Sequence, residues 1–100
     1  MKKSIINDKL NTLVQEFDFK DITELVKDYL VTEILYKISN FTEEIEHFEE
    51  KYGKSLIEFK KEYEKGKEDF EKYDNLMAWE FAQQGKEYWE KKLEEVKNVL

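Results

Sequence analysis

Apolar residues recur at alternating intervals of three and four across segment 31–52, and this pattern limits the available folds more than any other feature. The residues are Val31, Ile34, Ile38, Phe41, Ile45, Phe48 and Tyr52. Such spacing places one apolar stripe along a helix, and a stripe three heptads long needs another helix to cover it. Segment 78–100 offers a second stripe, which starts with small residues: Ala78, Ala82, Gly85, Trp89, Leu93, Val96 and Leu100. Bulky residues facing small ones predict a long antiparallel helical hairpin with a coiled-coil-like seam.

The absence of proline among 100 residues supports an all-α fold, because loops and sheets normally use proline in their turns. Asp21 and Ser55 each begin a capping-box pattern, and Gly53 suits a left-handed stop after a helix. We therefore predict one domain of about four helices. Their ranges are 1–19 for an N-terminal helix, 21–52 for a long helix, 55–64 for a short helix and 74–100 for a long last helix, capped by Asp74.

Two local features bear on these boundaries. Ser39 and Asn40 could interrupt the long helix, but the apolar spacing keeps its phase across them, so we expect the helix to continue. The motif beginning at Phe48 recurs near positions 59 and 70, and this spacing of 11 residues suits one continuous helix. Gly53 and Gly66 argue against that alternative, since each glycine costs about 1 kcal/mol inside a helix.

Gly85 lies in the middle of the predicted last helix, where glycine is unfavourable unless a neighbour needs the space. We expect a bulky residue of the opposing stripe to approach it closely. Phe41 and Tyr36 are the two candidates, and the choice depends on the register of the hairpin.

The charge composition narrows the class of partner. The net charge is -7, 41% of the residues are charged, and all 17 basic residues are lysines. An acidic chain without arginine is a poor binder of DNA or RNA and suits a basic protein partner better. The sequence has no cysteine, no signal-peptide pattern and no stretch that approaches a membrane span. We therefore expect a cytoplasmic protein that binds neither nucleic acid nor membrane.

Candidate catalytic groups are few. Glu44 and His47 have the Glu-x-x-His spacing of di-iron helical bundles, but His47 is the only histidine, and both residues flank the apolar stripe. Many glutamates lie among lysines at helical spacing, as on ordinary solvated helix faces. We predict no enzyme activity, no cofactor and no metal site.

The most distinctive segment is 74–82, with the sequence DNLMAWEFA. Aromatic residues are typical anchors of protein interfaces. The predicted partner-binding residues are Met77, Trp79, Glu80, Phe81 and Tyr88. Trp79 lies about 100° around the helix from Ala78, so it either packs in the core or faces a partner.

Two family resemblances add to this interpretation. Segment 48–59 (FEEKYGKSLIEF) together with 74–82 resembles small helical proteins of archaea and bacteria that often lie beside genes for putative toxins and are regarded as antitoxin-like. The resemblance covers roughly residues 20–100 and implies a helical body that blocks a partner by binding it. Segments 9–14 and 21–26 are similar to the two helices of ribbon-helix-helix repressors. The basic strand of those repressors is missing here, which argues against DNA binding and leaves dimerisation open.

The combined prediction is a non-enzymatic protein-binding module. The resemblance implies an antitoxin that neutralises a basic toxin by masking it. The alternative is a structural coiled-coil homo-oligomer or adaptor without a toxin partner.

Overall fold

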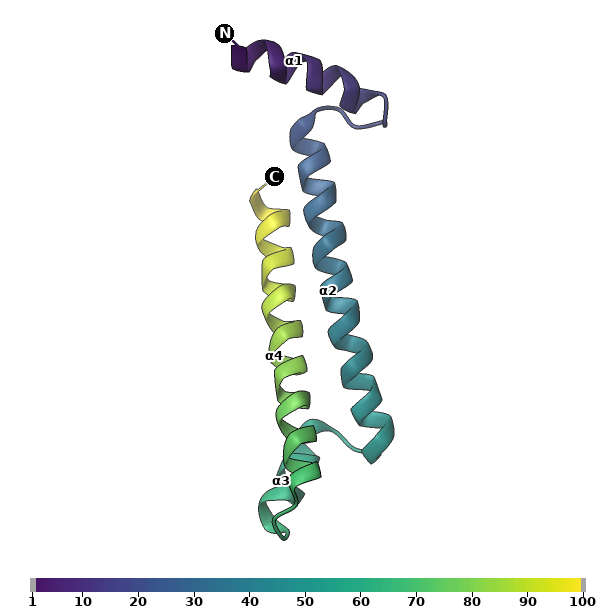
Figure 1. Cartoon of the computed structure of the whole chain (residues 1–100), viewed down its shortest axis with the longest axis vertical. Coiled ribbons are helices and arrows are strands. Elements are labelled where there is room, and N and C mark those ends of the chain that lie inside the picture. Colours follow the sequence, from purple (N-terminus) through teal and green to yellow (C-terminus); the bar gives the residue numbers. More distant parts are fainter. Residues whose placement is uncertain (1, 100) are drawn as a thin grey trace.

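The computed structural model is all-helical over the part of the chain that it describes, which is the backbone of residues 2–99 and the side chains of residues 8–99. The helices are α1 (Lys2–Gln15), α2 (Ile22–Tyr52), α3 (Leu56–Lys65) and α4 (Phe70–Val99). The long helices α2 and α4 run antiparallel and side by side, and α3 lies at the closed end of the hairpin (Figure 1). The predicted all-α hairpin is thus confirmed. Leu100, the last residue of the predicted second stripe, lies outside the described residues.

The register of the hairpin is fixed by contacts that advance regularly along both helices. Lys37 places its Nζ 5.1 Å from the ring centroid of Trp89. Phe41 occupies the space above Gly85, so it is the bulky neighbour that the sequence left undecided between two candidates. Closer to the turn, Phe48 stacks on Trp79 with ring centroids 5.5 Å apart. Bulky side chains of α2 therefore lie against small or flat residues of α4.

Asp21, Ser55 and Gly53 are the capping residues of α2 and α3, as predicted, although Glu24 accepts the Lys20 N–H at 3.1 Å rather than the Asp21 N–H that a capping box would use. The Asp21 carboxylate accepts a hydrogen bond from the Glu24 N–H at 2.9 Å, and the Ser55 hydroxyl accepts one from the Glu58 N–H at 3.3 Å. Gly53 has a φ of 62°, a left-handed conformation in which a Cβ is unfavourable, and it ends α2. The helix continues through positions 39 and 40 as expected. Local sequence therefore determines where these helices begin and end.

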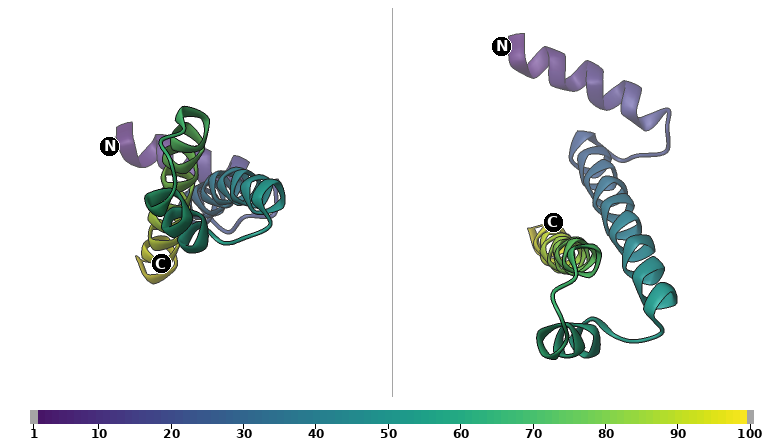
Figure 2. Two further views of the ribbon diagram at one scale, coloured as in Figure 1. Left: turned by 90° about the horizontal axis from the view of Figure 1, so that it is seen from below. Right: turned by 60° about the horizontal axis from the view of Figure 1, so that its bottom comes forward.

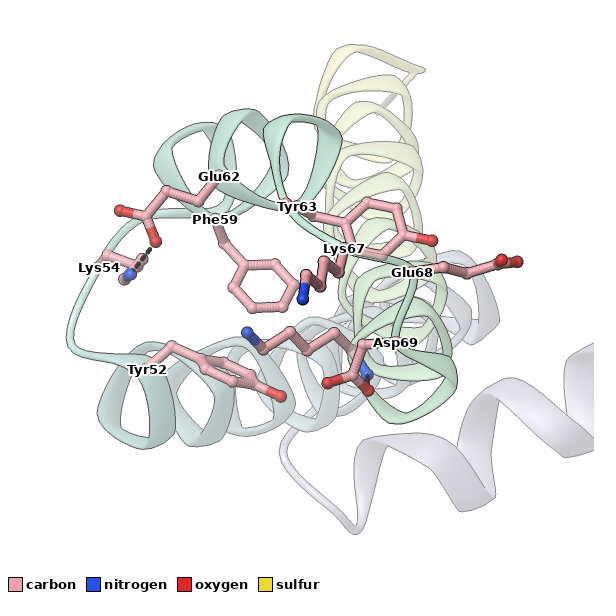
Figure 3. A pocket seen from close by; sticks show the side chains of 10 residues that line it. Tyr52, Lys54, Phe59, Glu62, Tyr63, Lys67, Glu68 and Asp69 are labelled. Atoms are coloured by element: carbon pink, nitrogen blue, oxygen red, sulfur yellow. Dashed lines mark hydrogen bonds and ion pairs between the residues drawn. The ribbon is translucent and has the colours of Figure 1, made fainter.

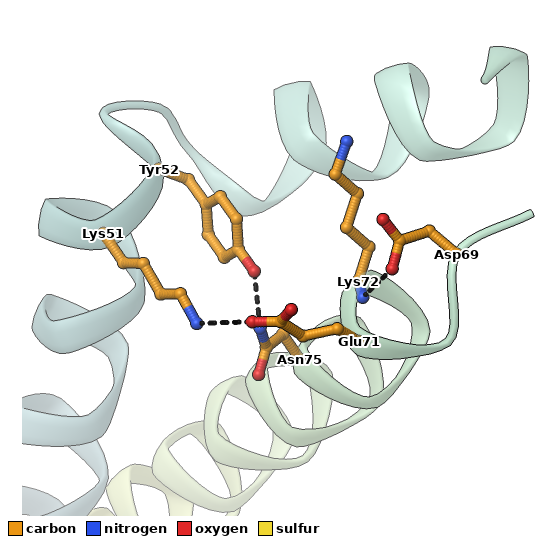
Figure 4. Close-up of polar contacts among 6 residues, drawn as sticks. All are labelled: Lys51, Tyr52, Asp69, Glu71, Lys72 and Asn75. Carbon is orange, nitrogen blue, oxygen red and sulfur yellow. Dashed lines mark hydrogen bonds and ion pairs between the residues drawn. The ribbon is translucent and has the colours of Figure 1, made fainter. Parts of the chain in front are cut away.

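The start of α4 differs from the prediction. The helix begins at Phe70, four residues before the predicted N-cap Asp74. Asp69 is the capping residue instead, because its carboxylate accepts the Lys72 N–H at 3.1 Å (Figure 4). Near this first turn, Lys51 of α2 forms an ion pair of 3.5 Å with Glu71, and the Asn75 amide donates to the Tyr52 hydroxyl. These contacts join the additional turn to the end of α2.

The corrected start of α4 predicts unequal effects of two aspartate substitutions. Asp69→Ala removes the cap of α4 and should lower the free energy of unfolding by about 1 kcal/mol. Asp74→Ala alters a solvent-exposed position inside the helix and should change it by less than about 0.5 kcal/mol. Urea titrations followed by circular dichroism would compare the two variants. A larger loss for Asp74→Ala would contradict the start at Phe70.

The hydrophobic core lies where α2, α3 and α4 meet. Its buried members are Ile45, Phe48, Phe59, Leu76, Trp79 and Ala82. Trp79 is the largest fully buried side chain and is only 1% exposed. Its ring contacts Phe48 of α2 and Phe59 of α3, each with ring centroids 5.5 Å away. The short helix α3 packs against α4 at the closed end of the hairpin (Figure 2), so the core there is built from three helices.

The opposite end of the molecule is thinly packed. α1 crosses the start of α2 (Figure 1), where Val14 is buried and the Asn11 side chain accepts the Ile22 N–H at 2.8 Å. The radius of gyration is 21.0 Å, against about 13 Å for a compact domain of 100 residues. None of the described helices has the length and apolarity needed to cross a membrane.

Candidate functional site

Helix α4 carries an aligned set of exposed apolar side chains. These side chains form what we call the outer stripe, and its members are Phe70, Tyr73, Met77, Phe81 and Tyr88. Their spacing of three, four, four and seven residues keeps them on one side of a helix. Exposed fractions reach 78% for Phe70 and 65% for Phe81. The exposed Gln84 interrupts the stripe between Phe81 and Tyr88. An exposed apolar row of this kind is a typical mark of a protein-interaction site.

The position of the outer stripe follows from the position of the core. Met77 and Phe81 are each two residues away from Trp79, which places them about 160° around the helix axis from that buried ring. Since α2 and α3 cover the Trp79 side, the stripe lies largely outside their contact with α4. It touches them at its edges, where Phe81 meets Phe41 of α2 and Tyr73 meets Tyr63 of α3, with ring centroids 5.9 and 6.3 Å apart.

Three of the five predicted partner-binding residues lie on the outer stripe, and two do not. Met77, Phe81 and Tyr88 are exposed on it. Trp79 is buried in the core, so its assignment to a partner-facing surface is wrong. Glu80 is half-buried, and its carboxylate forms an ion pair of 3.3 Å with Lys60 of α3. Its main visible role is therefore to hold α3 against α4.

Phe70 and Tyr73 were missed because both precede position 74, the predicted start of the last helix. Their spacing relative to Met77 was the signal that could have identified them. Extending the helical period upstream by one turn places all three on one face. The structure thus extends the candidate surface toward the closed end of the hairpin.

Contacts beside the stripe orient two of its rings without covering them. The ring of Phe81 meets Phe41 of α2 edge to face, with centroids 5.9 Å apart. The ring of Tyr88 stands at 87° to that of Trp89, with centroids 5.1 Å apart, and Lys92 places its Nζ 5.4 Å from the Tyr88 centroid. Rings held in this way lose less conformational entropy when a partner binds.

The acidic charge of the chain is concentrated on the body of the hairpin. Residues 38–100 contain eleven lysines and seventeen aspartates or glutamates, whereas residues 1–37 contain six and seven. Asp74 adds a carboxylate next to the outer stripe, since it is one helical turn from both Phe70 and Met77. The outer stripe therefore belongs to an acidic body of net charge -6.

A cleft of about 230 Å³ opens between α3 and the start of α4 (Figure 3). Its walls combine aromatic rings, including Phe59 and Tyr63, with lysines and carboxylates. Lys54 is paired with Glu62, and Asp69 is engaged as the cap of α4. These polar groups serve structural contacts, and the lining residues include no serine, cysteine or histidine that could act as a nucleophile or base. The cleft is therefore a weaker candidate than the outer stripe.

The structure brings no metal-ligand cluster together among the side chains that it describes: no group of three His, Cys, Asp or Glu converges there. His47 lies beside Phe48, with ring centroids 5.6 Å apart, and is exposed on the flank of α2. The Glu-x-x-His spacing at position 44 thus does not gain further ligands from the other described helices.

Comparisons with known proteins find no match: no protein-family model, no curated protein and no solved structure resembles the chain significantly. The similarity to antitoxin-like proteins and to ribbon-helix-helix repressors stays a prediction. Functional inference therefore depends on the surface geometry and charge described above.

Proposed function

We propose that the protein is a non-enzymatic binding module that captures a basic protein partner with the outer stripe of α4. One observation carries the proposal, namely the alignment of five exposed apolar side chains on a side of α4 that α2 and α3 touch only at its edges. Aromatic and methionine side chains of this kind are enriched at protein interfaces. Phe70 and Tyr88 are 18 residues apart, so the stripe is about 27 Å long, which suits contact with a partner helix or groove.

The charge of the body supports a basic partner. A net charge of -6 on residues 38–100 raises the encounter rate with a positively charged surface and disfavours acidic competitors. The apolar stripe then supplies the contact area that holds the complex. Because the initial attraction is electrostatic, we expect the association rate to fall as salt increases, with less effect on dissociation.

The narrower form of the proposal is an antitoxin that masks a basic toxin in the cytoplasm. It is supported by the family resemblance together with the acidic body and the exposed stripe. Masking requires no catalytic group in this chain, because tight occupation of the partner's own working surface is sufficient.

Site-specific photo-crosslinking in the native host would identify the partner. A benzoylphenylalanine at position 81 should crosslink to one basic protein, whereas the same probe at Lys61, an exposed position of α3, should not. Crosslinking to an acidic protein, or equally at both positions, would contradict the proposal. If the captured protein is a toxin, its expression alone should arrest growth, and co-expression of this chain should restore it.

Once the partner is known, two phenylalanine variants test the surface. Phe81→Ala should weaken binding at least tenfold, a loss of about 1.4 kcal/mol, because it removes a central ring of the stripe. Phe17→Ala changes a phenylalanine at the other end of the molecule that is 74% exposed, against 65% for Phe81, and should leave binding within a factor of two. Isothermal titration calorimetry measures both. Equal losses would place the partner elsewhere.

A further inference from the structure

The first half of α2 carries a second, mostly apolar face that α4 does not cover and that α1 approaches only at Ile22. We call it the rear stripe, and its members are Ile22, Leu25, Tyr29, Thr32 and Tyr36. The intervals are three, four, three and four residues, the spacing by which one helix pairs with another. Tyr29 is 61% exposed and Tyr36 is 64% exposed.

The rear stripe faces away from α4. Ile34 is buried on the α4 side of α2. Relative to Ile34, residues 25, 29 and 36 lie roughly 140–180° around the helix axis. The same stretch of α2 therefore has apolar residues on two opposite faces, of which α4 covers only one.

The accessible surface of the chain is large for its mass. It amounts to 8053 Å², whereas a compact monomer of 12.2 kDa exposes about 6,000 Å². The excess is about 2,000 Å². Each partner in a standard protein interface buries about 800 Å², so the exposed surface is sufficient for a stable dimer in addition to the outer stripe.

We propose that the rear stripe pairs with the rear stripe of a second copy, in an antiparallel arrangement centred on Tyr29. The stripe is close to symmetric about this residue, since Ile22 and Tyr36 lie seven residues away on either side, and Leu25 and Thr32 lie four residues before it and three residues after it. A two-fold axis at Tyr29 therefore brings Ile22 of one copy against Tyr36 of the other, and Leu25 of one copy close to Thr32 of the other.

The charge distribution favours a second copy of this chain as the partner that covers the rear stripe. Residues 1–37 carry a net charge of only -1, with six lysines against seven acidic residues, so two such segments can meet with little repulsion. The body carries -6, and two bodies in contact would repel each other. The N-terminal third is therefore the part of the chain most compatible with its own copy.

The same charges select the antiparallel direction. In a parallel pair the two acidic bodies would lie side by side, with helix axes about 10 Å apart. In an antiparallel pair centred on Tyr29, each closed end lies about 35 Å from the axis in opposite directions, since 23 residues separate Tyr29 from Tyr52. That distance greatly exceeds the screening length of about 8 Å at physiological salt.

The proposed dimer would present two outer stripes at distant ends of one elongated particle. This inference is independent of the proposed partner capture, because it uses different residues. If both hold, the complex has two binding faces for the partner.

Sedimentation equilibrium of the full chain tests the pairing. We expect the wild type to have twice the mass of the chain at micromolar concentrations. Tyr29→Glu should raise the dimer dissociation constant at least tenfold with unchanged helix content. Tyr88→Glu is the matched control, since it places the same charge at a tyrosine that is 54% exposed on the outer stripe, and it should leave the constant within a factor of two. A monomeric wild type, or a loss with Tyr88→Glu alone, would overturn the proposal.

Single cysteines test the direction of pairing, because the natural chain has none. Tyr29→Cys should give a covalent dimer on mild oxidation, since the two copies of this residue meet at the axis. Tyr36→Cys should not, because its two copies would lie about 21 Å apart, too far for a disulfide. Efficient crosslinking at position 36, or none at position 29, would overturn the antiparallel arrangement even if a charged variant fails to fold.

Discussion

Trp79→Ala is expected to lower the free energy of unfolding by about 3–5 kcal/mol, the usual loss when a buried aromatic side chain is truncated to alanine. The ring of Trp79 is almost fully enclosed and contacts aromatic rings from both neighbouring helices. Few other side chains are fully buried, so little of the core can move to fill the cavity. Domains of this size have a total stability of about 5–15 kcal/mol, and the variant should therefore be largely unfolded well below the wild-type melting temperature.

Urea titrations of variants that carry Trp89→Phe would measure this loss by circular dichroism and, where Trp79 is retained, by fluorescence. Phe81→Ala serves as the control, because that exposed ring should cost less than about 1 kcal/mol. If Trp79→Ala leaves the stability unchanged and weakens partner binding, the tryptophan belongs to the interface and the position of α3 is incorrect.

The contrast between Trp79 and Phe81 shows where sequence reasoning succeeds and where it stops. A two-helix interpretation places the core along Ala78, Ala82 and Gly85, and the structure agrees for that seam. That interpretation could not predict that α3 covers the neighbouring face of α4, where Trp79 lies about 100° around the helix axis from Ala78. That coverage depends on the path of the chain after Gly53 and on contacts between residues distant in sequence, such as Phe59 with Trp79.

The helix boundaries likewise divide into those that local sequence determines and one that depends on contacts between residues distant in sequence. Asp21, Ser55 and Gly53 were assigned correctly because their capping contacts involve residues only three or four positions away. The start of α4 was assigned incorrectly, because Asp69 and Asp74 are both suitable N-cap residues. The choice between them depends on the short connection from α3 and on the contacts that Glu71 and Asn75 make with the end of α2.

Gly85→Leu is expected to destabilise the hairpin by about 1–3 kcal/mol by overpacking its seam. A Cβ built on Gly85 would lie 2.5 Å from Cζ of Phe41 and 2.7 Å from its Cε2. Real side-chain carbons do not approach so closely, so either the ring must leave the seam or the two helices must separate. The gain in helix propensity on replacing glycine, about 1 kcal/mol, offsets only part of this cost.

A second substitution at Phe41 should relieve the overpacking, and this rescue tests the register directly. Phe41→Ala alone leaves a gap in the seam and should also destabilise the protein. In the double variant Gly85→Leu/Phe41→Ala, the leucine occupies the space of the lost ring, so the combined loss should be smaller than the sum by about 1–2 kcal/mol. Tyr36→Ala is the matched control, because that side chain is 64% exposed and should give no rescue. Additive effects with Phe41, or rescue by Tyr36→Ala, would mean that α2 and α4 are paired one or more turns away from this register.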